Sequence, residues 1–208
     1  MAASYSAEEL ARIASYEEAL AVQLAAKPKR LEHSLSVASC AEDLALADGL
    51  DPSPARVAGI LHDWCKAYTA QEQAELCARY GVAFEAPLEL LGPIMHGPLA
   101  AGMLPERFPE LDGAVLAAIA RHTVGDPDMG ELDAVVFVAD AIEPLRGDYP
   151  AAARLRAMAG NAPLAELAFA AVSESVRYVI ETGRYLYPVA IETYNALALG
   201  AGLRKGDA

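Results

Sequence analysis

Six side chains that could bind a metal ion are spread along this chain, each in or beside an apolar segment with helical spacing. They include all four histidines of the 208 residues. The set is His33, His62, Asp63, His96, His122 and Asp140. Imidazole nitrogens and carboxylate oxygens bind borderline divalent metals, and an unpartnered carboxylate in an apolar segment is costly. The sequence therefore predicts a fold whose helices bring these six side chains to one shared cluster of cations.

The spacing of apolar residues is typical of helices. Residues 31–47 place leucine and alanine three and four apart, and residues 5–26 carry a similar amphipathic pattern. Thr69 and Glu72 form a capping box before a helix that Gly81 ends. No segment alternates cleanly at a period of two, so the predicted fold class is all-α. Further helices are expected after the N-cap Ser53 with Pro54, and at 112–121, 163–182 and 188–199.

Two segments are ambiguous. Residues 83–110 are rich in proline and glycine, which predicts short helical pieces around His96 rather than one long helix. Residues 132–142 contain the run VVFV, which could be a buried strand. No second run of this kind exists to pair with it, so we expect a helix there.

The net charge of −13 limits the partners that the chain can have. It argues against DNA, RNA or an acidic membrane surface, all of which are polyanionic. It does not argue against a small anionic substrate, because metal ions and a few basic side chains can reverse the potential locally. The expected partner is a small molecule.

The sequence predicts a cytoplasmic protein with no membrane span. Its three cysteines form no C-x-x-C, which favours a reducing compartment over a disulfide framework. The amino-terminal segment carries acids where a secretory signal needs an apolar run. The longest uncharged stretch, residues 90–105, is too short and too broken to cross a bilayer. The apolar terminal helices leave a homodimer open as an alternative to a monomer.

Phosphate chains need positive donors beside a metal site, and four basic residues lie close to the six positions in sequence. Lys66 follows Asp63 by three residues, and Arg146 follows Asp140 by six. Arg30 and Arg121 lie three residues before His33 and directly before His122, although alone either could be a solvated surface charge. Thr123 and Gly125 could add hydroxyl and backbone donors.

The order His…His-Asp…Asp resembles the HD-domain phosphohydrolases, which are all-helical enzymes. Within that superfamily, six segments are similar to the YqeK family, the bacterial symmetrical diadenosine tetraphosphatases. They are residues 30–34 (RLEHS), 58–66 (AGILHDWCK), 96–98 (HGP), 121–125 (RHTVG), 138–146 (VADAIEPLR) and 188–195 (PVAIETYN). The family usually has histidine in place of Tyr187 and threonine in place of Val124.

The resemblance implies a single HD domain over residues 1–208, with a metal-binding core at about 28–146 and a helical C-terminal extension at about 150–200. It assigns the six residues above as ligands of two divalent or trivalent metal ions, with iron expected and manganese or cobalt as alternatives. Asp63 and Lys66 are expected to be catalytic. The expected substrate-binding residues are Arg30, Lys66, Arg121, Thr123, Gly125 and Arg146.

The expected enzyme is a symmetrical bis(5'-nucleosyl)-tetraphosphatase. In this prediction a metal-activated hydroxide attacks an inner phosphorus of diadenosine tetraphosphate and releases two ADP. One alternative is an HD phosphohydrolase for another dinucleoside polyphosphate or for a nucleoside triphosphate. The other is a metal-bearing nucleotide sensor with little turnover.

Overall fold

The computed structural model describes residues 3–147 and 149–200, and within these ranges it contains α-helices and short 3₁₀-helices but no strand. The α-helices are α1 (Ala7–Gln23), α2 (Pro28–Ala47), α3 (Pro52–Leu61), α4 (Ala70–Tyr80), α5 (His96–Arg107), α6 (Gly113–Arg121), α7 (Glu131–Ile142), α8 (Pro150–Met158), α9 (Leu164–Glu181) and α10 (Pro188–Gly200). The 3₁₀-helices are η1 (Trp64–Ala67), η2 (Leu88–Leu90) and η3 (Pro144–Arg146). The predicted all-α fold class is confirmed.

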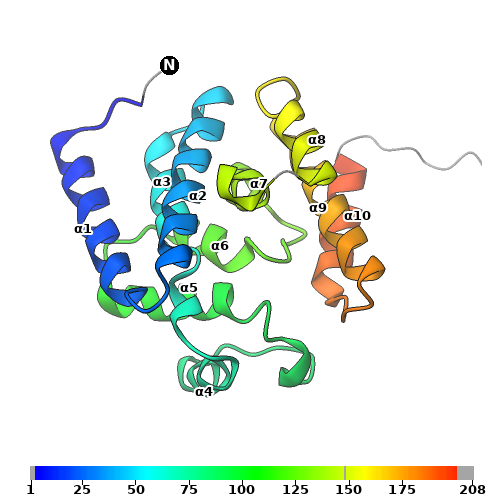
Figure 1. The fold of residues 1–208 in the computed structure, drawn as a ribbon, viewed down its shortest axis with the longest axis horizontal. Coiled ribbons are helices and arrows are strands. Elements are labelled where there is room, and N and C mark those ends of the chain that lie inside the picture. The colour runs from blue at the N-terminus through cyan, green and yellow to red at the C-terminus, as the bar shows by residue number, and fades with distance from the viewer. Residues whose placement is uncertain (1–2, 148, 201–208) are drawn as a thin grey trace, which may run out of the picture.

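Helix α7 lies in the middle of the molecule. Figure 1 shows it nearly end-on, between α2 and α3 on one side and α8 to α10 on the other. Val136 belongs to an apolar cluster that also contains residues of α1, α3, α5 and α6, whereas Val135 and Phe137 belong to a second cluster with residues of α2, α8 and α9. A helix that is apolar on every side belongs in the interior. Residues 132–142 are therefore helical, as expected, and their run of β-branched residues reflects burial.

Helices α2 and α3 pack unusually close together because Gly59 has no side chain. A Cβ built on Gly59 would lie 2.6 Å from the Cα of Ala38 in α2. This contact brings the backbones that carry His33 and His62 together, and the two imidazole centroids are 5.3 Å apart. The close approach therefore fixes the spacing of two candidate ligands.

Helix ends agree with most of the expected caps. The hydroxyl of Thr69 accepts a hydrogen bond from the backbone N–H of Glu72, and Gly81 ends α4 in the left-handed conformation. The expected cap of α3 was wrong by two residues. Asp51 is the N-cap and Pro52 takes the first helical position, because the Asp51 carboxylate accepts the N–H of Ser53.

The segment 83–110 is more regular than its composition predicts. It contains the short η2, but residues from His96 onward form α5, a helix of 12 residues that includes Pro105. Pro98 lies in the first turn, where no intrahelical N–H is needed. The expectation of short pieces around His96 was therefore wrong for this half of the segment.

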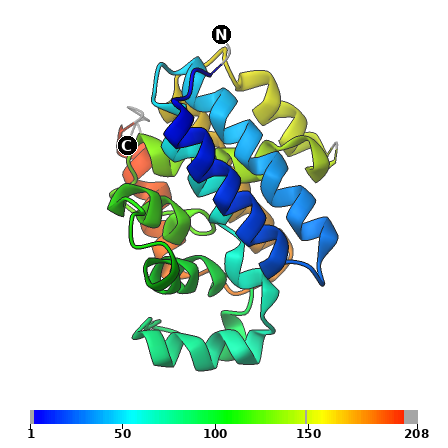
Figure 2. The ribbon, with the colours of Figure 1, turned by 90° about the vertical axis from the view of Figure 1, so that its left-hand side faces the viewer.

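Two helices lie towards the outside. Figure 2 shows α1 in front of α2 and α3, and α4 at one end of the molecule. Within the described ranges, no helix combines the length and the apolar character needed to cross a membrane.

Candidate metal centre

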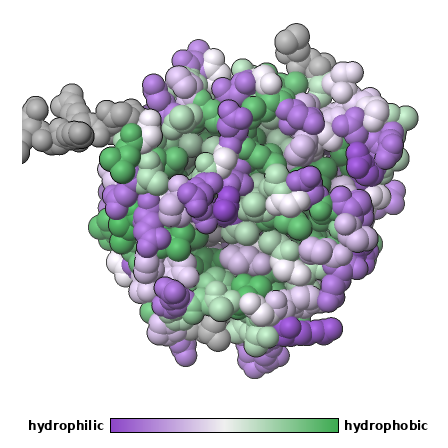
Figure 3. Space-filling model, turned by 180° about the vertical axis from the view of Figure 1, so that it is seen from behind, coloured by the Kyte–Doolittle hydropathy of each residue, from purple (hydrophilic) through white to green (hydrophobic). Residues whose placement is uncertain are grey.

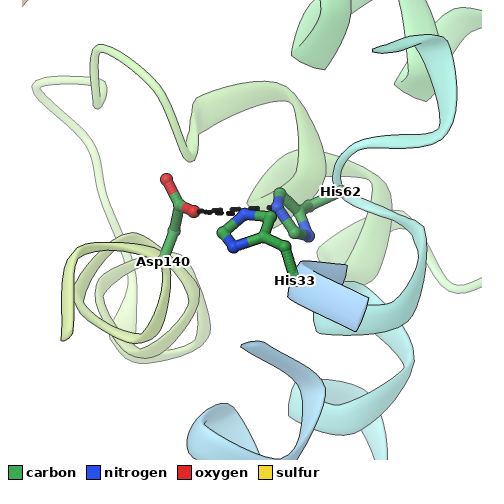
Figure 4. A group of neighbouring side chains, drawn as sticks. All are labelled: His33, His62 and Asp140. Carbon is green, nitrogen blue, oxygen red and sulfur yellow. Dashed lines mark ion pairs between the residues drawn. The ribbon is translucent and has the colours of Figure 1, made fainter. Parts of the chain in front are cut away.

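The six residues expected to bind metal come together inside the helical bundle. His33 lies within α2 and Asp140 lies within α7. Figure 4 shows Asp140 reaching from α7 towards the imidazoles of His33 and His62, and its Oδ1 lies 3.0 Å and 3.8 Å from their Nε2 atoms. The other candidate ligands lie at helix ends: His62 and Asp63 after α3, His96 at the start of α5, and His122 after α6.

Asp63 lies between two pairs of histidines. Its Oδ2 is 3.6 Å from His33 Nε2 and 3.5 Å from His62 Nε2. Its Oδ1 is 3.1 Å from His96 Nε2 and 4.0 Å from His122 Nε2. One buried carboxylate therefore offers a separate oxygen to each pair, which is the arrangement that two neighbouring cations would need.

Backbone carbonyls orient two of the imidazoles. Nδ1–H of His62 donates to the carbonyl of Gly59, and Nδ1–H of His122 donates to that of Ile119, both at 2.7 Å. Each carbonyl is three residues back, in the last turn of a helix that would otherwise leave it unpaired. With the proton on Nδ1, each neutral ring turns the Nε2 lone pair towards the cluster.

The donor atoms of this cluster fit a cation. Nε2 of His33 and Nε2 of His62 are buried and make no hydrogen bond, although carboxylate oxygens lie beside them. Nε2 of His96 and Nε2 of His122 face each other at 2.9 Å. Lone pairs this close repel unless a proton or a cation lies between them, and imidazole with carboxylate suits borderline divalent metals. The groups that could hold an ion include His33 with His62 and Asp140, and His62 with Asp63 and His122.

Burial and charge set the protonation of the cluster. Burial, with His96 and His62 nearby, lowers the pKa of His122 to about 3. Burial also lowers the pKa of His96, against the opposing effect of Asp63. Burial would raise the pKa of Asp63, but His62 and His96 outweigh it and hold that pKa well below its usual range. Burial would lower the pKa of His62, but the carboxylates of Asp63 and Asp140 raise it. The carboxylates of Asp63 and Asp140 therefore favour a positive charge beside the His62 ring, and a metal ion can supply that charge.

Glu143 contacts the side of the His33 ring that faces away from the cluster, and this role was not expected from the sequence. The side chain is 1% exposed and accepts a hydrogen bond from Nδ1–H of His33 at 3.0 Å. Its second oxygen accepts the backbone N–H of Leu145 at 2.7 Å. A carboxylate that orients a ligating histidine is a common partner in metal sites. The sequence held only a weak signal for it, because Glu143 follows Asp140 by three residues but lies just after α7, as its C-cap.

A cavity of about 730 Å³ opens beside the cluster. Its floor is formed by Asp63, His96, His122 and Asp140. The expected substrate-binding residues Arg30, Lys66, Thr123 and Arg146 also line it. Seen from behind, the molecular surface mixes hydrophilic and hydrophobic side chains and is hollowed near its middle (Figure 3).

Two of the cavity's basic residues pair with floor carboxylates. Nη1 of Arg30 lies 2.7 Å from Oδ2 of Asp63, and Nη2 of Arg146 lies 2.5 Å from Oδ1 of Asp140. Burial lowers the pKa of Lys66, with Arg30 and Arg146 adding to the effect while Asp63 opposes it. No side-chain acceptor within the described residues bonds to its ammonium group. Lys66 is thus available to an anion in the cavity.

The structure does not bring Arg121 and Gly125 to the cavity. Nη1 of Arg121 lies 2.7 Å from Oδ2 of Asp133, and its Nη2 lies 3.4 Å from Oδ1 of Asp126. Gly125 has φ of 78°, and a Cβ there would lie 2.5 Å from Cγ2 of Thr193. These two residues hold the α6–α7 loop to α7 and α10, a packing role that sequence adjacency to His122 did not reveal.

Comparisons with known proteins agree with this geometry. Residues 30–145 match the HD domain family. The chain is 31% identical over 170 residues to the symmetrical bis(5'-nucleosyl)-tetraphosphatase of Halalkalibacterium halodurans, a match covering 82% of this chain and 89% of that protein. It is 30% identical over 189 residues to the protein of the same name from Bacillus subtilis, covering 89% and 98%.

A solved structure is similar over almost the whole chain. It is the crystal structure of a protein from Clostridium acetobutylicum described as a predicted HD superfamily hydrolase involved in NAD metabolism. The TM-score is 0.77 at 28% identity, covering 94% of this chain and 98% of that one. The chain therefore belongs to the HD domain family, and within it groups with the symmetrical bis(5'-nucleosyl)-tetraphosphatases.

Proposed function

We propose that this chain is a metal-dependent hydrolase that cleaves diadenosine tetraphosphate symmetrically into two ADP. The observation that carries the proposal is Asp63, which lies on the floor of a cavity lined by basic side chains and whose two oxygens face two pairs of buried imidazoles. The names of the relatives from Halalkalibacterium halodurans and Bacillus subtilis support the choice of substrate.

The six side chains would hold two metal ions, with Asp63 offering one oxygen to each. His33, His62 and Asp140 would hold one ion together with Oδ2 of Asp63. His96 and His122 would hold the other together with its Oδ1. When bound, two such ions supply Lewis acidity and a water of lowered pKa. We propose iron as the metal, while manganese and cobalt accept the same nitrogen and oxygen donors.

The chain's own residues position and neutralise the phosphates. Lys66 would bind a phosphate oxygen with its ammonium group, and Arg146 would do so with the guanidinium N–H groups left free by Asp140. The Thr123 hydroxyl, 3.2 Å from His122 Nε2, would donate to a phosphoryl oxygen beside the floor. Donors fixed in this way stabilise charge that develops on the equatorial oxygens.

The proposed reaction consumes one water molecule. The water oxygen bonds to one of the two inner phosphorus atoms, and the bond from that phosphorus to the central bridging oxygen breaks. The bridging oxygen leaves with the second ADP, and the two protons of water are shared between the two products. No covalent enzyme intermediate is needed.

Product analysis tests the proposal. The purified protein, assayed separately with iron, manganese and cobalt, should convert diadenosine tetraphosphate to two equimolar ADP on anion-exchange chromatography. Metal analysis should find close to two ions per chain in the active form. AMP with ATP would contradict symmetrical cleavage. Faster turnover of a guanine dinucleotide or a nucleoside triphosphate would favour the other nucleotide hydrolases, and binding without turnover would favour a sensor.

Three further expectations stay predictions. They are the single domain over residues 1–208 with its core at about 28–146 and extension at about 150–200, the cytoplasmic location, and a homodimer as an alternative to a monomer. Limited proteolysis, localisation of a tagged chain and light scattering test them in turn.

A further inference from the structure

One side of the cavity is built from aromatic and basic residues outside the segment that matches the HD domain family. We call it the tyrosine wall and define it as Tyr178, Arg184, Tyr185 and Tyr187, which come from the end of α9 and the loop before α10. Tyr187 lines the cavity together with Val124 of the α6–α7 loop. The wall is therefore a part of the site that the metal centre does not explain.

Arg184 is a positive group with no carboxylate partner in the described part of the chain. Its guanidinium carbon lies 5.2 Å from the ring centroid of Tyr178, which holds the side chain by a cation–π contact. Arg30 and Arg146, in contrast, both pair with carboxylates of the floor. In a chain with 29 acidic and 16 basic residues, an arginine beside a cavity without an acidic partner indicates an anionic ligand.

Tyr185 presents a large exposed ring beside that arginine. It is 41% exposed, and its ring centroid lies 6.5 Å from that of Tyr187. Tyr187 in turn packs edge-on against Phe84, with centroids 6.4 Å apart. Phe84 belongs to the loop after α4, so this contact ties two loops together and gives Tyr185 a fixed neighbour.

We propose that Arg184 and Tyr185 form a subsite for one nucleotide half of the substrate, an inference that rests on the proposed function. Cleavage at the central bridge requires the middle of the tetraphosphate to lie at the metal floor, so each ADP half must extend away from it. Arg184 binds a phosphate of one half, and the ring of Tyr185 stacks on its adenine. Tyr187, backed by Phe84, supports Tyr185.

The test compares Arg184→Ala and Tyr185→Ala with one control, Arg177→Ala, and with the conservative variant Tyr185→Phe. Arg177→Ala removes an arginine of α9 that pairs with Glu174 and Glu181 and does not line the cavity. Tyr185→Phe keeps the ring and removes only the hydroxyl. Isothermal calorimetry with Mn²⁺ present measures the dissociation constants of ADP and inorganic pyrophosphate, and initial rates give KM for diadenosine tetraphosphate.

Arg184→Ala should raise the dissociation constants of ADP and pyrophosphate, and KM, by about 10-fold, the usual loss for one charge-assisted hydrogen bond. Tyr185→Ala should raise the dissociation constant of ADP by about 10-fold, as expected for the loss of one stacked base, and leave that of pyrophosphate unchanged. The control Arg177→Ala should match the wild type, and Tyr185→Phe should restore the ADP binding that Tyr185→Ala loses, because stacking needs only the ring. Because both side chains are exposed, the variants should fold, which circular dichroism checks.

The outcomes separate the two proposals. ADP binding that stays within about two-fold in both alanine variants, or a wild type that binds no ADP, would overturn the subsite. A wild type that binds ADP through Arg184 and Tyr185 but releases AMP and ATP would overturn the proposed function and leave the subsite standing.

Discussion

The floor of the cavity and the tyrosine wall differ in how the chain holds them. The candidate ligands of the floor are carried by packed helices, and His96 and Asp63 are each only 2% exposed. The wall comes from the end of α9 and a loop, and Tyr178 and Tyr185 are 52% and 41% exposed. A change in the floor disturbs buried groups for which an unpaired charge is costly, whereas the exposed side chains of the wall remain solvated. We therefore expect substitutions in the floor to lower the catalytic rate, and substitutions in the wall to weaken substrate binding.

Asp63→Asn should have the largest effect. It keeps the size of the side chain but removes the negative charge that both histidine pairs face, so metal loading should fail. We expect kcat/KM to fall by at least about 1,000-fold, the scale of losing metal-assisted catalysis. The exposed Asp48→Asn is the matched control. Measurable activity with a full metal content would show that Asp63 is not central to the floor.

Glu143→Gln should weaken the floor from behind. The amide cannot accept the His33 Nδ1 proton as strongly as a carboxylate, so the ring is held less firmly. Loss of such a partner typically costs about 10- to 100-fold in metal affinity or activity. Competition with a chelator measures the affinity, and the exposed Glu192→Gln serves as control. Unchanged metal affinity would mean that Glu143 only caps η3.

Gly59→Ala tests whether helix packing sets the spacing of the floor. The new methyl group would clash with the backbone of α2 at Ala38, so the two helices must move apart or their backbones must distort. Overpacking of this kind costs about 1–3 kcal/mol of unfolding free energy, which urea denaturation measures. Gly113→Ala is the control, because nothing lies within 4 Å of a Cβ at Gly113. Equal stability of the two variants would contradict the close-contact argument.

The sequence predicted the floor better than the wall for a physical reason. Buried histidines and aspartates in apolar helices are costly, so Asp63 and Asp140 stand out from their neighbours without knowledge of the fold. Glu143 did not stand out, because an acid after a helix looks solvated until the packing of α2 against α7 buries it. Tyr185 lies in a loop whose place depends on how α9 packs on α7. Local patterns carry no information about that contact.

Arg121 gives the smallest expected effect and contrasts directly with Arg184. Both arginines lie at the end of a helix or just beyond it, but adjacency to His122 made only Arg121 a substrate-binding candidate from the sequence. In the structure Arg121 bonds to Asp133, which is 5% exposed, and does not line the cavity. Arg121→Ala should therefore leave KM for diadenosine tetraphosphate within about two-fold, while Arg184→Ala raises it by about 10-fold.

The same variant should cost stability instead. Removing Arg121 leaves the Asp133 carboxylate with only the backbone N–H of Gly130, at 3.0 Å, among the partners seen in the described residues. We expect a loss of about 1 kcal/mol in the free energy of unfolding, because the remaining hydrogen bond keeps Asp133 partly satisfied. Urea denaturation and steady-state kinetics on the same preparation separate the two effects. A large rise in KM with unchanged stability would mean that Arg121 binds the substrate. It would contradict the packing role given to Arg121 here.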